Sequence, residues 1–229
     1  MTPIELQLFL LSFFLLFFTS LQISAYSNTP RDRFWVFIAV SYFQISGISL
    51  LLSPFHLLKP PWFLGIQIGL ALIVLLISRS VKIQRPAGLN KVGDKSFKGT
   101  LKQATNKRVA IILCSMLPIS LIIISLLQRI VIPIHTGDAM YYHASRPLYW
   151  IKNASMAPYN TANSRQITFA FGSNIIFMWP VLFTHSEFVG RLVHWLGLPV
   201  GSLGFYTILQ ELGRNKFKSL LGMTAFLSM

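Results

Sequence analysis

Long apolar runs separated by short polar breaks dominate the chain. The first three runs cover residues 6–24, 34–58 and 62–78, and the breaks between them are Arg31-Asp32-Arg33 and Lys59-Pro60-Pro61. Each run is near the roughly 20 residues that a helix needs to cross the hydrocarbon core of a bilayer. Backbone groups in lipid must pair within their own segment, which favours helices. The pattern therefore predicts N-terminal transmembrane helices within residues 1–78.

A basic segment, residues 79–108, interrupts this pattern. It lacks apolar periodicity and contains glycines and a proline, which is typical of a flexible loop. Nine basic residues lie in it: Arg79, Lys82, Arg85, Lys91, Lys95, Lys98, Lys102, Lys107 and Arg108. The positive-inside rule places such a loop in the cytoplasm. Counting spans from there predicts that residues 135–166 lie on the outer side.

The remaining segment, residues 109–229, holds further apolar runs. We expect a span at 109–134, an outer loop at 135–166 and a span at 192–212, while the run 219–229 is too short to cross a bilayer and predicts an interrupted final segment. Residues 168–185 form either another span or a helix along the outer membrane surface. The second alternative is favoured because it leaves Arg214, Lys216 and Lys218 in the cytoplasm. The predicted fold class is an all-α, polytopic transmembrane bundle whose extracytoplasmic loop contains short interfacial helices.

Composition agrees with this class of protein. Hydrophobic residues make up 53% of the chain and charged residues 11%, and the mean hydropathy is +0.59. Soluble domains carry more charge. The net charge of +14 invites comparison with nucleic-acid-binding proteins. We exclude a nucleic-acid partner because the topology signal already accounts for the basic loop. The expected environment is a lipid bilayer.

The outer loop carries the candidate chemistry. Asp138 is its single carboxylate, in the run Gly137-Asp138-Ala139-Met140-Tyr141-Tyr142-His143. One interpretation makes Asp138 the N-terminal cap of a short amphipathic helix. The other makes it a general base that accepts the proton of an attacking hydroxyl. Around it we expect Tyr142, His143 and Trp150 to shape a sugar pocket. Three arginines are candidates to bind a donor phosphate: Arg146, Arg165 and Arg191.

These residues resemble a known family. The pattern Asp138…Tyr142-His143…Arg146…Trp150, with the later Phe-Val-Gly-Arg191-Leu, looks like the first outer loop of the GT-C membrane glycosyltransferases. The nearest in style are the dolichyl-phosphate-mannose protein mannosyltransferases and the aminoarabinose transferases of lipid A. The resemblance covers residues 109–216. It implies an inverting sugar transfer from a polyprenyl-phosphate-linked donor to an acceptor hydroxyl, with Asp138 catalytic, in a bacterial inner membrane.

Two alternatives stay open. His135, Asp138 and His143 match no strong zinc pattern, so no metal ligand is assigned. A divalent cation remains an option only because some members of the resembled family use one. The second alternative is a non-enzymatic multi-pass protein, such as a transporter fragment or an assembly subunit. Against transport, no acidic residue lies in the middle of a predicted span. The sequence does not indicate an oligomeric state.

Overall fold

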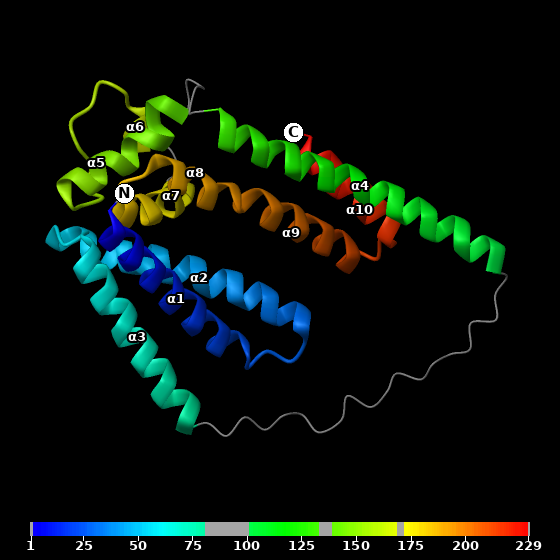
Figure 1. Cartoon of the computed structure of the whole chain (residues 1–229), viewed down its shortest axis with the longest axis horizontal. Coiled ribbons are helices and arrows are strands. Elements are labelled where there is room, and N and C mark those ends of the chain that lie inside the picture. Colours follow the sequence, from blue (N-terminus) through cyan, green and yellow to red (C-terminus); the bar gives the residue numbers. More distant parts are fainter. Residues whose placement is uncertain (1, 81–100, 133–138, 169–171, 229) are drawn as a thin grey trace. The chain divides into compact units, whose positions relative to one another are not determined.

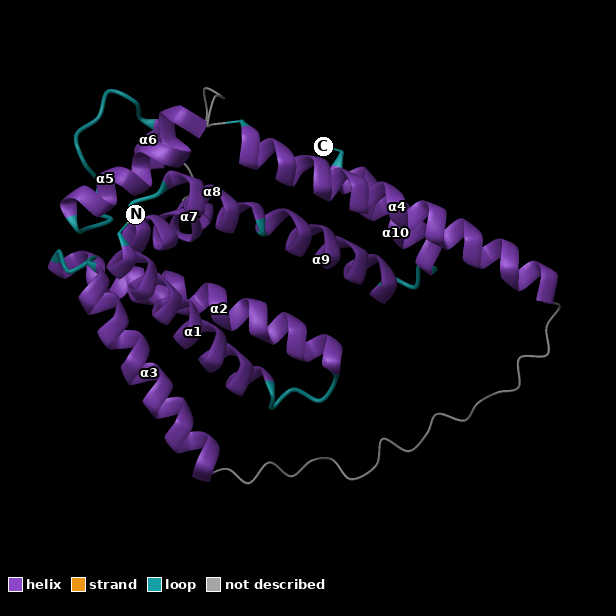
Figure 2. Ribbon diagram, in the orientation of Figure 1, coloured by secondary structure: helices purple, strands orange, loops and turns teal. Residues whose placement is uncertain are grey.

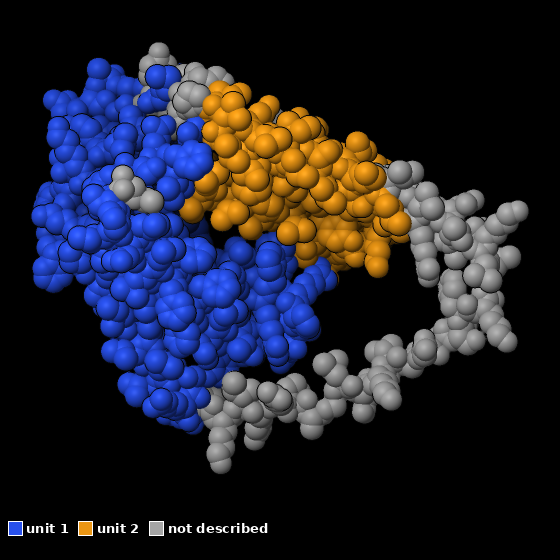
Figure 3. All heavy atoms as spheres, viewed as in Figure 1, with its two compact units in different colours: residues 1–88, 134–191 blue, residues 89–133, 192–229 orange. Residues whose placement is uncertain are grey.

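Helices are the only regular elements in the described part of the chain. A computed structural model describes residues 2–80, 101–132, 139–168 and 172–228 (Figure 1, Figure 2). Two compact units divide the chain (Figure 3). Unit 1 comprises residues 1–88 and 134–191, and unit 2 comprises residues 89–133 and 192–229. The all-helical class predicted from the sequence is thus confirmed for the described residues.

Three long helices and several short ones build unit 1. The long helices are α1 (Pro3–Ser24), α2 (Pro30–Leu52) and α3 (Pro60–Ser80). The short elements are η1 (Ser53–Phe55), η2 (Ala139–Ala144), α5 (Ser145–Asn153), α6 (Arg165–Thr168) and α7 (Gly172–Thr184). α1 packs against α2 and α3, and α7 packs against α1, α2 and α5. α7 is therefore the centre of this unit.

Three helices and the end of a fourth build the described part of unit 2. α10 (Lys216–Leu227) packs against both α4 (Leu101–Val131) and α9 (Gly197–Glu211). The boundary between the units falls within α8 (Glu187–Trp195). In unit 2 the indole Nε1 of Trp195 donates a hydrogen bond of 2.9 Å to Ser125 Oγ. This bond joins the end of α8 to α4.

Within the described residues, four helical stretches are long and apolar enough to cross a membrane. They are Pro3–Ser24, Pro30–Phe55, Pro60–Ser80 and Glu187–Glu211. In the most apolar 18-residue stretch of α1, only 22% of the residues are buried inside the protein. Most of the large apolar side chains of α1 therefore face outward. The buried residues of α1 are instead small or polar in four of five cases: Ser12, Leu16, Thr19, Ser20 and Ser24. Small residues inside and apolar residues outside are typical of helices packed in lipid. By length and composition, the described helices are consistent with a multi-pass membrane protein.

Polar side chains join α1 to its neighbours. Thr19 Oγ1 donates to Gln44 Oε1 of α2 at 2.8 Å. Deeper in the unit, Ser12 Oγ donates to Gln67 Oε1 of α3 at 2.7 Å and accepts from Trp179 Nε1 of α7 at 3.0 Å. All three groups of this second network are buried, and Gln67 Nε2 also donates to the Ser12 carbonyl at 3.3 Å. One serine thus connects three helices.

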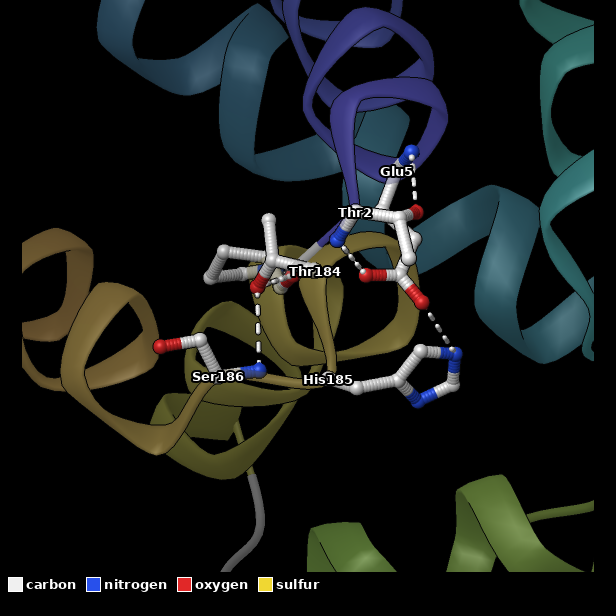
Figure 4. A network of polar contacts seen from close by, with 6 residues as sticks. Thr2, Glu5, Thr184, His185 and Ser186 are labelled. Carbon is white, nitrogen blue, oxygen red and sulfur yellow. Dashed lines mark hydrogen bonds and ion pairs between the residues drawn. The ribbon is translucent and has the colours of Figure 1, made fainter.

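The first turn of α1 meets the end of α7 (Figure 4). Thr2 and Glu5 form a capping box, in which the Thr2 N–H donates to Glu5 Oε2 and the Thr2 hydroxyl accepts from the Glu5 N–H. The other oxygen of Glu5 lies 4.0 Å from His185 Nε2. His185 has a left-handed φ of 49° and directly follows α7. The carboxylate that caps α1 therefore also contacts the residue that ends α7.

The helix ends differ from the predicted runs in three places. The run 34–58 ends as an α-helix at Leu52, because Ser53-Pro54 opens a 3-10 turn and His56 is left-handed. α4 begins at Leu101, so residues 101–108, predicted as part of the basic loop, are helical. That segment contains no glycine or proline, and its leucine, lysines, glutamine, alanine and arginine favour helix.

α7 is the third difference. It has 13 residues, which is short of the roughly 20 that a span needs. Most of its residues are buried against protein, including Asn174 and Trp179. A helix lying on a membrane surface would keep a polar face in water. The described part of α7 has no such face, and its position relative to a bilayer stays a prediction.

Candidate functional site

Two turns that are distant in the sequence form one wall of the candidate site. The turn after α2 and the turn after α5 are joined by hydrogen bonds, from Ser155 Oγ to the Ser53 carbonyl at 2.8 Å and from the Met156 N–H to Ser53 Oγ at 2.7 Å. The Leu58 N–H donates to the Ala154 carbonyl at 3.0 Å. Left-handed residues shape both turns: His56 with φ 55° and Ala154 with φ 51°. This pairing fixes the segment after α5 onto the α2–α3 connection.

α5 presents one buried face to unit 1. Its buried residues are Arg146, Pro147 and Trp150, of which Arg146 and Trp150 are four positions apart. Residues at this spacing lie one above the other on a helix. Pro147 falls in the first turn, where the backbone N–H has no helical partner to lose. The sequence spacing therefore brings the guanidinium and the indole to one side of α5.

The Arg146 side chain is 1% exposed. Its Nη2 donates to the Arg165 carbonyl at 2.6 Å, and its Cζ lies 5.9 Å from the centre of the Trp150 ring. Moving a charged group out of water is costly unless partners compensate. Here a backbone carbonyl and an aromatic face compensate in part. Arg146 is therefore a buried cation on α5 and a candidate functional residue.

Arg146 and Trp150 line a cavity of about 430 Å³ within unit 1. The opposite walls come from the turn after α2 and from residues 155–167. The lining residues are Leu50, Ser53, Pro54, His56, Arg146, Trp150, Ser155, Met156, Ala157, Pro158, Tyr159, Gln166 and Ile167. This volume lies within the range of small-molecule sites. The walls combine apolar and aromatic surface with a few polar groups.

Tyr159 and Gln166 form the polar part of the wall. The Tyr159 hydroxyl donates to Gln166 Oε1 at 3.0 Å, and Thr161 Oγ1 donates to the same oxygen at 2.9 Å. Gln166 Nε2 donates to Ser145 Oγ at 3.2 Å, at the start of α5. The ring of Tyr159 stacks on Tyr149 at 3.8 Å between centroids. The loop after α5 is thereby folded back onto that helix.

The ionisation of Tyr159 reflects this environment. Partial burial raises the pKa of the phenol above its ordinary value, and the nearby Arg146 cation acts in the opposite direction. A phenol with a raised pKa stays neutral at physiological pH and keeps its proton for hydrogen bonding. Tyr159 therefore acts as a hydrogen-bond donor at the cavity wall.

The remaining predicted residues lie elsewhere in unit 1. His143 is half-buried, and its Nδ1 is 2.9 Å from Asn174 Oδ1 of α7. Arg165 is exposed on α6 and contributes its carbonyl to Arg146. Arg191 lies on α8 with its Cζ 5.7 Å from the centre of the Phe188 ring. Among the described residues, those that line the cavity include none of these three.

Two predictions cannot be followed to side chains. Asp138, the predicted base, lies outside the described residues, as does His135. The backbone of Tyr142 belongs to η2, which begins immediately after Asp138 in the sequence. Among described residues, no group of three or more His, Cys, Asp or Glu side chains is arranged to hold a metal ion.

Of the cavity residues, sequence reasoning predicted only Arg146 and Trp150, and it missed His56, Tyr159 and Gln166 among others. His56 comes from the α2–α3 turn, roughly a hundred residues before the other two, and the Ser53–Ser155 pairing that unites these segments has no local sequence signal. His56 Nδ1 lies 3.1 Å from the Asn153 carbonyl. This contact follows from the same pairing of turns.

Comparison with known proteins gives no match to a family model, to a curated protein or to a solved structure. The GT-C resemblance therefore rests on the outer-loop residues quoted above. The geometry around Arg146 is the physical basis for a functional proposal.

Proposed function

We propose that this chain is a membrane glycosyltransferase of the GT-C type, which moves a sugar from a polyprenyl-phosphate-linked donor to an acceptor hydroxyl. The observation that carries the proposal is the buried Arg146 guanidinium in the wall of a small-molecule-sized cavity. Guanidinium groups bind phosphate oxygens through charge-assisted hydrogen bonds, which are stronger than neutral ones. A phosphodiester in this cavity would meet that cation in a site with limited water.

The rest of the lining suits a sugar. Trp150 and Tyr159 offer aromatic surface, against which the apolar face of a pyranose ring can pack. Gln166 and His56 offer amide and imidazole groups, which exchange hydrogen bonds with sugar hydroxyls. Such a combination of apolar walls and a few polar groups is typical of ligand sites. This favours a neutral polar group attached to a phosphate over an entirely apolar ligand.

In the proposed step, Asp138 is the general base. Its carboxylate accepts the proton of the acceptor hydroxyl while the acceptor oxygen forms a bond to the anomeric carbon. The bond from that carbon to the donor phosphate oxygen breaks, and its electron pair leaves with polyprenyl phosphate. Negative charge thus grows on the phosphate, where the Arg146 cation stabilises it. The inverting stereochemistry is carried over from the resembled family.

A binding experiment tests the phosphate assignment. The full chain is reconstituted in lipid nanodiscs and titrated with undecaprenyl phosphate or with undecaprenol, which lacks the phosphate. We expect the wild type to bind the phosphate form, and Arg146→Gln to weaken that binding by about tenfold or more, since hydrogen bonds to charged groups are worth about 1.5–3 kcal/mol. Lys152→Gln is the matched control, because Lys152 is an exposed cation on the same helix.

Turnover separates the enzyme from the alternative. Release of polyprenyl phosphate from a polyprenyl-phosphate sugar is measured with the wild type and with Asp138→Asn. We expect Asp138→Asn to bind the donor normally and to release no polyprenyl phosphate. Donor binding without any release by the wild type would support the non-enzymatic alternative. Equal affinity for undecaprenyl phosphate and undecaprenol would remove the role of Arg146.

A further inference from the structure

The α9–α10 hairpin of unit 2 turns sharply at a cluster of cations. Gly213, with a left-handed φ of 76°, donates its N–H to the Gln210 carbonyl, and the Arg214 N–H donates to the Leu209 carbonyl. These two bonds form a Schellman motif, a common way to end a helix at glycine. Asn215 then caps α10 by accepting from the Lys218 N–H at 2.9 Å. The backbone positions of Arg214 and Lys218 are thus fixed by the turn.

A groove runs from this turn along the two helices. Its volume is about 350 Å³, and it is lined by Phe205, Leu209, Arg214, Lys218, Gly222, Ala225 and Phe226. Apart from the two cations the lining is apolar. The Phe205 and Phe226 rings stack at 5.5 Å between centroids with an interplanar angle of 17°. The groove therefore has a basic end and an aromatic wall.

Gly222 lets α10 pack closely against α9 beside the groove. A Cβ at this position would lie 2.4 Å from Leu209 Cδ1 and 3.3 Å from Phe205 Cε1. Only glycine lets α10 approach these side chains so closely.

We propose that this groove binds an anionic phospholipid, with the lipid phosphate at Arg214 and Lys218 and an acyl chain along the apolar lining. Both cations are exposed, and residues 211–218 hold three basic residues against one acid, Glu211. A phosphate fits the cations by charge, and an acyl chain fits the remainder of the lining by polarity. The part of the chain that the structure describes has four helices long and apolar enough to span a bilayer, so lipid is the solvent to be expected around such a surface.

Charge complementarity distinguishes this ligand from other occupants of an apolar groove. An apolar helix of another protein would pack against the apolar wall, but it would leave the two cations without a complementary charge. A zwitterionic lipid brings a choline or ethanolamine cation close to Arg214 and Lys218, which weakens its attraction. The groove shares no lining residue with the cavity in unit 1, so lipid binding here does not depend on the proposed glycosyltransferase activity.

Photo-crosslinking tests this site. The full chain is reconstituted in phosphatidylcholine nanodiscs that contain a small fraction of phosphatidylglycerol or phosphatidylcholine carrying a diazirine on one acyl chain. After illumination, labelled peptides are identified by mass spectrometry. We expect the segment 205–226 to be labelled more by phosphatidylglycerol than by phosphatidylcholine. Each cation near a membrane surface should contribute about fivefold to the preference.

Variants locate the preference at the groove. Lys218→Gln should lower labelling by phosphatidylglycerol several-fold, and the double variant Arg214→Gln, Lys218→Gln should reduce it to the phosphatidylcholine level. Lys216→Gln is the matched control, because Lys216 belongs to the same turn but does not line the groove. Ala225→Trp, which places a large ring in the groove, should lower labelling by both lipids.

Two outcomes would overturn the proposal, one from the wild type and one from the control variant. Equal labelling of segment 205–226 by the two lipids would show that the cations select nothing. A loss of preference in Lys216→Gln as large as in Lys218→Gln would show a diffuse surface charge instead of a site. Far-ultraviolet circular dichroism of each variant checks that the helices remain folded.

Discussion

The serine that connects three helices of unit 1 offers a sharp test of the fold. We expect Ser12→Ala to destabilise the protein substantially, although it removes one oxygen atom from a small side chain. In the wild type, Ser12 Oγ accepts from Trp179 Nε1 at 3.0 Å and donates to Gln67 Oε1 at 2.7 Å. Both partners are buried, so water cannot replace the lost contacts.

The magnitude follows from the two hydrogen bonds. Hydrogen bonds between membrane helices average about 0.6 kcal/mol, which sets a lower limit near 1 kcal/mol for two of them. A buried group left without its partner costs about 1–3 kcal/mol, which raises the expected value to about 2 kcal/mol. The double variant Ser12→Ala, Gln67→Leu also removes the Gln67 amide, which loses its partner in Ser12→Ala. The double variant should therefore lose less free energy of unfolding than the sum of the two single variants.

Unfolding in mixed micelles with increasing denaturing detergent, followed by tryptophan fluorescence, measures these free energies. Ser120→Ala is the control, because the exposed Ser120 hydroxyl donates only within its own helix, to the Leu117 carbonyl. It should change stability by less than about 0.5 kcal/mol. The reasoning is refuted if Ser12→Ala behaves like Ser120→Ala, or if the effects of Ser12→Ala and Gln67→Leu simply add.

Two further predictions concern packing and ionisation. Gly190→Ala should destabilise the protein by about 1–3 kcal/mol, because the new Cβ would lie 2.6 Å from Val181 Cγ2 and 3.0 Å from Phe177 Cε2. Gly69→Ala is the control and should be neutral or stabilising, because its new Cβ would have no atom within 4 Å. Equal melting temperatures of the two variants would contradict this prediction. Tyr159 should ionise above its ordinary pKa of 10.0, so that its contribution to stability is complete below that pH and is lost as the pH rises through the higher, folded-state pKa. An ultraviolet titration of wild type minus Tyr159→Phe measures this, and a midpoint below 10.0 would contradict it.

The apolar pattern predicted the long helices well, because lipid leaves the backbone little choice but to be helical. The runs 6–24 and 62–78 correspond to α1 and α3 within a few residues. The start of α4 was predicted too late, since a run of helix-favouring polar residues carries no apolar signal. The burial of α7 follows from tertiary packing, which hydropathy along one chain does not contain.

The candidate site was predictable only where its residues share one element. Arg146 and Trp150 were predicted together and do line one cavity, because helical spacing places them on one face of α5. Tyr159, Gln166 and His56 were missed, since the contacts that unite them depend on the three-dimensional path of the chain. Arg191 was predicted at the same site, but on α8 it packs against Phe188 instead of lining the cavity.

The hydrogen bond from Ser155 to Ser53 joins residues that are 102 positions apart. A ribosome needs on the order of 5–20 s to add a hundred residues. During that interval the turn after α2 has already left the exit tunnel, but the partner that closes it has not yet been made. The first helices are therefore synthesised before the residues that cover this polar corner. Assembly of the cavity is consequently a late event of biosynthesis, because its walls are complete only after residues 146–167 have been made.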